Sequence, residues 1–116
     1  VCANVERVGG GALVDAWRLF EQSFEDESGN RHVLQIGVIG FVPPQIMQWD
    51  KANIDGKLVA TDIVDAAEKH LPDLLDAQPD LVIALCHSGI AGGERRGMEE
   101  NAALHLSKIE GIDVIL

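Results

Sequence analysis

The run Leu81-Val82-Ile83-Ala84-Leu85-Cys86-His87-Ser88-Gly89 decides the fold of this chain. Its apolar part lies between Pro79-Asp80 and Gly89, and a run of this length with such boundaries predicts a β-strand that is covered on both faces. In open α/β sheets, the carboxyl ends of such strands border the ligand crevice. His87 follows the strand directly, and an imidazole can bind a metal or transfer protons. His87 is therefore the first candidate functional residue.

The segments on both sides of this strand have the periodicity of amphipathic helices. The first helix should begin at Thr61 or Asp62, which are both favourable N-cap residues, and Pro72 should kink or restart it. The second is predicted over residues 98–109, and a last strand over residues 112–116 follows it. The order helix, strand, helix, strand predicts a right-handed parallel crossover of the βαβ kind.

The first half of the chain reads as β-structure. Residues 1–5 are a short apolar stretch typical of a strand, while residues 17–24 and 32–42 flank turn chemistry and predict a hairpin. Residues 45–60 are expected to be irregular. The predicted fold class is therefore α/β, in the mixed α+β sense, with a β-hairpin followed by an α-β-α-β crossover in a layered sheet.

Size and charge limit what the chain can be. Its 116 residues suffice for one domain, and its net charge of −10 repels the phosphate backbone, so duplex nucleic acid is excluded as a partner. No run approaches the ~18 apolar residues of a membrane span, so no membrane partner is expected. Cys2 and Cys86 cannot form a disulfide framework and are expected to be buried thiols. Val1 opens strand-like sequence without a signal-peptide pattern, as a mature or trimmed chain also would.

The four histidines differ in how well their sequence positions suit a metal ligand. A lone histidine at a strand end is either structural or a ligand, and a metal site needs several ligands. His32, His70 and His105 have no ligand spacing with His87, and each is expected to be structural or solvated. A nucleophilic pair of Cys86 with His87 is disfavoured, because adjacent strand residues point to opposite faces.

Three other segments allow two interpretations each. The glycine-rich loop 89–97 could bind phosphate through its backbone amides, although it is neither a Walker motif nor a dinucleotide fingerprint, and Arg95 and Arg96 are expected to be solvated. The acidic residues 25–27 form a cation site or a solvated turn. Trp49 either stacks on a nucleobase or packs over the end of a sheet.

One long block carries a family resemblance. Residues 36–53 read IGVIGFVPPQIMQWDKAN, and LCHSG at residues 85–89 follows in order. Together they resemble the bacterial 2′,3′-cyclic-nucleotide 2′-phosphodiesterase/3′-nucleotidases, which belong to the calcineurin-like metallophosphoesterases alongside the 5′-nucleotidases. The resemblance covers essentially the whole chain, and residues 41–53 are far more specific than the histidine motif.

The resemblance implies a two-metal phosphohydrolase with the four-layer metallophosphoesterase fold, in which two packed sheets are flanked by helices. In that family the metal ligands come from an Asp-x-His motif, a Gly-Asp motif, a Gly-Asn-His-Glu motif, a histidine followed by Ser-Gly, and a Gly-His-x-His motif. Only the fourth is present here, which implies that His87 is a metal ligand. The other motifs would precede Val1 or follow Leu116, so residues 1–116 are expected to be a single partial domain, the central-to-C-terminal portion of the catalytic domain. Asn4 is expected to be structural.

The resemblance also implies a reaction and its requirements. The full enzyme would open 2′,3′-cyclic nucleotides to 3′-nucleotides and hydrolyse these to nucleoside and phosphate, using two divalent metal ions of the Mn, Zn, Co or Mg class. The chain alone is expected to hold no metal stably and to be inactive. Small nucleotides are the expected partners, the periplasm is the expected location, and exposed strand edges are expected to allow a homo-oligomer.

Two other hypotheses stay open. The chain could be a small α/β phosphate- or nucleotide-binding module that uses loop 89–97, or a structural domain without a ligand. No catalytic residue is assigned from the sequence, and the substrate-binding residues are unknown.

Overall fold

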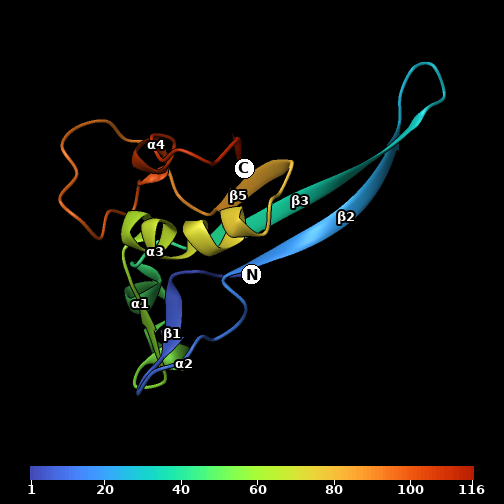
Figure 1. Ribbon diagram of the computed structural model, residues 1–116. Coiled ribbons are helices and arrows are strands. Elements are labelled where there is room, and N and C mark those ends of the chain that lie inside the picture. The colour runs from blue at the N-terminus through green and yellow to red at the C-terminus, as the bar shows by residue number, and fades with distance from the viewer.

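The main sheet has four strands and is built around a long hairpin. The computed structural model describes all of residues 1–116, and its strands lie in the order β2-β3-β5-β6 (Figure 1). β2 (Trp17–Glu25) and β3 (Arg31–Phe41) pair antiparallel, while β5 (Leu81–Cys86) runs parallel to β3 and β6 (Val114–Ile115) runs parallel to β5. The predicted hairpin, the predicted strand before His87 and the parallel order of the later strands are confirmed.

The chain also forms a smaller two-stranded sheet and two short helices, which lie on the side of the body away from the hairpin tip (Figure 1). β1 (Val5–Arg7) pairs antiparallel with β4 (Leu58–Ala60). Between β3 and β4 come α1 (Ile46–Trp49) and α2 (Lys51–Ile54). The prediction that residues 45–60 are irregular was therefore wrong.

The two prolines at the end of β3 explain this difference. The amides of Ile46 and Met47 donate to the carbonyls of Pro43 and Pro44, so the prolines that end the strand also open a helical turn. Proline suits the start of a helix, because its ring presets φ and its missing N–H is not needed there. The first strand also lies later than expected, at Val5–Arg7 rather than over residues 1–5.

The long helix α3 (Ile63–Asp76) covers one face of the main sheet (Figure 1). Asp62 is its N-cap, and the Asp62 side chain accepts hydrogen bonds from the amides of Val64 and Asp65 at 2.9 and 3.0 Å, as the sequence predicts for this residue type. Pro72 lies inside the helix, which continues past it to its end rather than restarting. None of the helices has both the length and the apolar character needed to cross a membrane.

Close packing of α3 on the sheet depends on one glycine. A Cβ atom at Gly37 would lie 2.7 Å from Cδ1 of Leu74, and Leu74 is fully buried. The missing side chain on β3 therefore lets the helix approach the sheet. The core between them is formed by 13 buried residues: Ala3, Ile39, Phe41, Ile63, Ala66, Ala67, Leu71, Leu74, Val82, Ala84, Cys86, Ala102 and Leu106.

Only one face of β5 is covered by the chain's own residues. Val82, Ala84 and Cys86 are buried against α3, while Leu85 on the opposite face is 44% exposed. The prediction of a strand covered on both faces was wrong for this reason, since the 116 residues place no layer over the second face.

The second predicted helix is much shorter than residues 98–109. Only α4 (Ala103–Leu106) is helical, and residues 89–101 form a loop. Met98 has a φ of 60°, in the left-handed region, which a right-handed helix cannot include. The Glu99 carboxylate accepts hydrogen bonds from the amides of Arg96 and Gly97, which lowers the pKa of Glu99 and stabilises the loop conformation. The last strand is likewise shorter than predicted.

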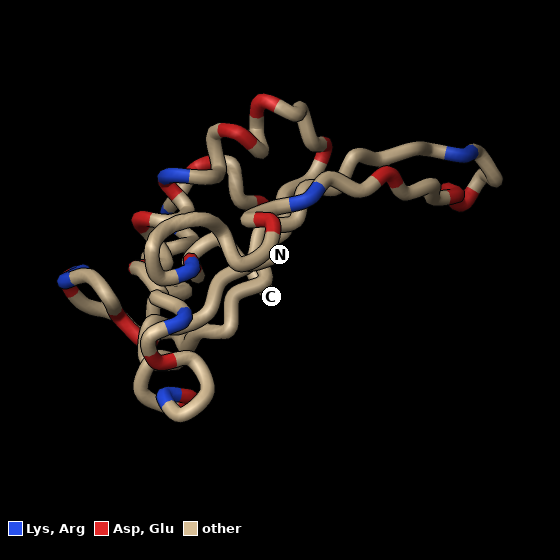
Figure 2. Tube along the Cα trace, turned by 90° about the horizontal axis from the view of Figure 1, so that it is seen from below, with Lys and Arg blue, Asp and Glu red and all other residues tan.

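The acidic group 25–27 caps the far end of the hairpin, which extends away from the body of the molecule (Figure 2). Asp26 accepts hydrogen bonds from the amides of Ser28 and Asn30, both at 2.9 Å, and contacts the ring of His32 at 2.8 Å. The hydrogen bond with His32, followed by those with Asn30 and Ser28, lowers the pKa of Asp26 to about 2. Asp26 thus shapes the turn, and His32 belongs to the same turn.

Candidate functional site

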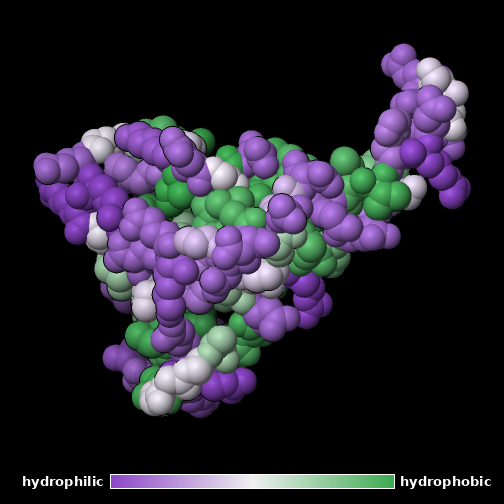
Figure 3. Space-filling model, in the orientation of Figure 1, coloured by the Kyte–Doolittle hydropathy of each residue, from purple (hydrophilic) through white to green (hydrophobic).

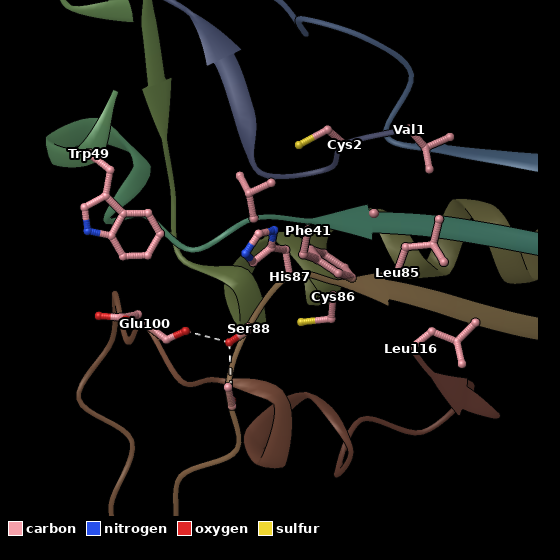
Figure 4. A pocket seen from close by; sticks show the side chains of 13 residues that line it. Val1, Cys2, Phe41, Trp49, Leu85, Cys86, His87, Ser88, Glu100 and Leu116 are labelled. Carbon is pink, nitrogen blue, oxygen red and sulfur yellow. Dashed lines mark hydrogen bonds between the residues drawn. The ribbon is translucent and has the colours of Figure 1, made fainter. Parts of the chain in front are cut away.

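The parallel pairing of β3 and β5 brings the ends of two strands together at His87. The register places Phe41, at the end of β3, beside Cys86, at the end of β5. The amide of His87 then donates to the carbonyl of Phe41 at 3.1 Å. The Cys86 side chain is buried in the core, whereas His87 is exposed (Figure 4). The two side chains therefore do not form a catalytic pair, as expected, and burial raises the pKa of the Cys86 thiol.

His87 lies in an open pocket with a volume of about 740 Å³ (Figure 4). Its lining brings together residues from six separate stretches of the chain: Val1, Cys2, Gly40, Phe41, Val42, Trp49, Leu85, Cys86, His87, Ser88, Gly89, Glu100 and Leu116. This is the strand-end crevice that the sequence predicts for His87. Neither Trp49 nor Glu100 was assigned to it from the sequence.

Trp49 reaches the pocket from α1. Its side chain is 60% exposed, so the indole does not pack closely over the end of the sheet. The ring faces the space beside His87 (Figure 4). An exposed aromatic face at a pocket is a surface on which a flat apolar group can stack.

Ser88 fixes the chain directly after His87. Its Oγ donates to the carbonyl of Glu100 at 2.6 Å and accepts from the amide of Ala102 at 2.7 Å. The hydroxyl is thereby committed to closing loop 89–101 (Figure 4), and its role is to position the loop. The sequence next to His87 does not indicate these partners of Ser88, because Glu100 and Ala102 lie more than ten residues further along the chain.

Asp62 and Arg95 tie the same loop to the start of α3. Asp62 is 4% exposed, and besides capping the helix it accepts hydrogen bonds from Arg95, at 2.7 Å, and from the amide of Met98. Arg95 also pairs with Asp65. Burial raises the pKa of Asp62, but the hydrogen bonds from the Asp65 amide, Arg95 and the Met98 amide outweigh it, so that the pKa lies below its ordinary value.

Arg95 is exposed, as expected, but its guanidinium also forms ion pairs. Two carboxylates hold its guanidinium, and these bonds raise the pKa of Arg95. A phosphate at loop 89–97 would have to compete with both carboxylates for this cation. Arg96 is exposed, as expected. The phosphate-binding hypothesis for this loop stays a prediction.

The residues present do not by themselves fit a dinuclear metal centre. No group of three or more histidine, cysteine, aspartate or glutamate side chains is arranged to hold a metal ion. His32 lies at the hairpin turn, His70 on α3 and His105 on α4, and none of them lines the pocket of His87. The chain thus supplies one candidate ligand, His87, and no reaction step through a metal follows from these residues alone.

Comparisons with known proteins agree with this geometry. No family model matches the chain. The sequence is 44% identical over 104 residues to a 2′,3′-cyclic-nucleotide 2′-phosphodiesterase/3′-nucleotidase of Salmonella typhimurium, covering 90% of this chain and 16% of the relative. It is 40% identical over 117 residues to the protein of the same name from Yersinia enterocolitica, covering 100% of this chain and 18% of the relative. The chain therefore spans less than a fifth of the length of these relatives.

Comparison of the fold with solved structures agrees with the sequence comparisons. The crystal structure of the calcineurin-like phosphoesterase YfkN from Bacillus subtilis matches with a TM-score of 0.90 and 40% sequence identity, over 99% of this chain and 35% of that one. The chain belongs to the calcineurin-like phosphoesterases. Within that class, its sequence corresponds to one segment of the 2′,3′-cyclic-nucleotide 2′-phosphodiesterase/3′-nucleotidases, whose names describe hydrolytic enzymes.

Proposed function

We propose that these 116 residues form part of the catalytic domain of a phosphohydrolase that acts on small nucleotides. In this proposal the complete protein, meaning the product of the reading frame that contains the chain, opens 2′,3′-cyclic nucleotides to 3′-nucleotides and hydrolyses these to nucleoside and phosphate. The names of the relatives support the reaction, and the match to a calcineurin-like phosphoesterase supports a requirement for divalent metal ions. Periplasmic location is part of the proposal through the family resemblance alone.

The observation that carries the proposal is the placement of His87. Its ring is exposed at the carboxyl end of β5, in the largest pocket of the chain, where a ligand crevice is expected. We infer that an imidazole nitrogen of His87 is one ligand of a divalent cation, whose other ligands come from outside residues 1–116. Bound divalent cations neutralise phosphate charge and lower the pKa of a bound water.

The residues around His87 hold it in place rather than react. The hydrogen bond from the His87 amide to Phe41 ties the two strand ends together. Ser88 then fixes the following loop through Glu100 and Ala102. A ligand whose backbone is fixed before the metal binds loses less conformational entropy on binding, which favours a defined coordination geometry. The net charge of −10 on these residues disfavours the approach of an anionic substrate, and bound cations would offset it.

The proposal is tested by comparing the complete protein with the 116-residue chain. With Mn²⁺ and 2′,3′-cyclic AMP, we expect the complete protein to release 3′-AMP and then adenosine and phosphate, as followed by chromatography. The 116-residue chain should show no turnover of bis-p-nitrophenyl phosphate above its His87→Ala variant, because it supplies one ligand. Turnover by the chain well above that variant would contradict the assignment of a partial site, and a complete protein inactive on cyclic and 3′-nucleotides would contradict the reaction.

A further inference from the structure

Polar contacts hold the loop of residues 89–101, which follows the segment that carries His87. No residue of this loop belongs to the core, and the surface of the loop, at the left of Figure 3, is mainly hydrophilic. Burial of apolar side chains among the described residues therefore does little to fix the loop. Its conformation depends instead on hydrogen bonds, and those of Ser88 with Glu100 and Ala102 tie its two ends together.

The returning end of the loop also packs against Gly89. A Cβ atom at Gly89 would lie 2.1 Å from Oδ1 of Asn101, so the missing side chain permits this close approach. The carbonyl of Gly89 accepts a hydrogen bond from the amide of Ala103 at 3.2 Å. Together with the two hydrogen bonds of Ser88, these contacts make the position of the returning chain decide where the backbone beside His87 lies.

Met98 has an unusual backbone conformation just before this closure. Its φ is 60°, in the left-handed region that residues other than glycine rarely adopt. A strained conformation of this kind persists only where the surrounding contacts impose it. Both backbone polar groups of Met98 have such partners: its amide donates to Oδ2 of Asp62, and its carbonyl accepts from Nε2 of Gln45 at 2.9 Å.

The buried carboxylate of Asp62 therefore does more than cap α3. Its Oδ1 accepts from the amides of Val64 and Asp65, and a serine hydroxyl caps a helix about as well. Its Oδ2 accepts from the amide of Met98, which lies 36 residues further along the chain. The second oxygen thus serves the loop that returns to His87 and not the helix.

We propose that Asp62 is a positioning residue for His87, a role that rests on the proposed function of His87 as a metal ligand. By holding Met98 in the left-handed conformation, Asp62 sets where the loop closes on Ser88 and Gly89. That closure sets the backbone of His87, and with it the place of the ring in the pocket. Asp62 does not line the pocket itself, so it acts through the loop.

A serine variant separates the loop contact from the helix cap. In the complete protein, Asp62→Ser keeps an acceptor for the first amides of α3 but has no second oxygen for the amide of Met98. Hydrogen exchange of the metal-free protein, measured by mass spectrometry, should become faster in residues 87–101 and stay unchanged in residues 63–76. The value of kcat/KM for 2′,3′-cyclic AMP should fall ~10-fold, as when a group that orients a metal ligand is removed. Unchanged exchange in residues 87–101, or unchanged kcat/KM, would overturn the proposal.

A second substitution tests whether Asp62 acts through Met98. Glycine adopts positive φ without strain, so Met98→Gly removes the need to impose this conformation. The double variant Asp62→Ser/Met98→Gly should therefore recover part of the lost kcat/KM, whereas a loss caused by weaker capping of α3 would persist. A double variant as slow as Asp62→Ser alone would contradict the proposed route.

Asp65→Ser is the matched control, because Asp65 also pairs with Arg95 but does not contact Met98. It should keep wild-type kcat/KM, and a loss equal to that of Asp62→Ser would assign the effect to Arg95 and contradict the proposal. Failure of the proposed function looks different: the wild-type protein would then be inactive on these nucleotides. The exchange measurement would still decide whether Asp62 holds the loop.

Discussion

Replacing His87 with alanine in the complete protein should lower kcat/KM for 2′,3′-cyclic AMP at least ~100-fold. The removal of a group that merely orients a metal ligand typically costs ~10–100-fold, so the loss of the ligand itself should cost more. The ring is exposed and lies outside the core. The free energy of unfolding should therefore change by no more than ~0.5 kcal/mol. Steady-state kinetics and urea unfolding of the same preparation measure the two quantities.

His32 offers a matched control for this prediction. It is also exposed, but it lies at the hairpin turn beside Asp26 and lines no pocket. His32→Ala should keep wild-type kcat/KM. If both variants lose activity equally, or if His87→Ala keeps full activity, the role proposed for His87 is wrong.

Replacing Asn4 with alanine should destabilise the fold by about 3 kcal/mol, at ~1 kcal/mol for each of three lost hydrogen bonds. Asn4 is fully buried. Its Nδ2 donates to the carbonyls of Val42 and Thr61 at 2.7 and 2.9 Å, and its Oδ1 accepts from the Val42 amide at 3.0 Å. The side chain therefore joins the end of β3 to the residue after β4. Alanine would leave backbone groups of both segments without these partners.

Asn53 provides the comparison for Asn4. It is exposed and donates one side-chain hydrogen bond, to Asp50. Asn53→Ala should change the free energy of unfolding by less than ~0.5 kcal/mol. Equal effects of the two variants in urea titrations would show that the buried amide does not hold the two segments together. The result also bears on the structural role that the sequence analysis assigned to Asn4.

The elements that the sequence predicted well are those with a strong periodic pattern. The alternation on both sides of the Ser28-Gly29-Asn30 turn predicts the hairpin, and the helical spacing from Ile63 to Leu74 predicts α3. Its cap was expected at Thr61 or Asp62, and the structure uses Asp62. In each case the pattern and the local capping chemistry favour the same structure. The position of His87 at a strand end followed from the same reasoning.

The elements that the sequence predicted poorly depend on contacts between distant residues. Residues 98–102 have helical spacing, but Asp62 and Arg95 hold the preceding loop across more than thirty residues, and this contact sets where α4 begins. The spacing of apolar residues gives no information about such a long-range polar contact. The open face at Leu85 was missed for a related reason, because an unbroken apolar run cannot show which of its faces the chain itself covers.

The residues of the candidate site also divide into those that a local sequence pattern predicts and those that depend on contacts between distant residues. His87 could be identified from its position after an apolar strand, and the resemblance of the His-Ser-Gly motif supplied its expected role. Trp49 and Glu100 join the pocket only through the packing of α1 and of loop 89–101. An aromatic residue after two prolines was a usable signal for Trp49, although it did not indicate to which site the ring belongs.

The most direct measurement is the position of a bound metal relative to the ring of His87. Crystals of the complete protein grown with Zn²⁺ should show an anomalous scattering peak at ~2.0–2.1 Å from one imidazole nitrogen of His87, the distance usual for zinc–histidine bonds. A metal-loaded, active protein in which every metal lies beyond bonding distance of that ring would contradict the central claim.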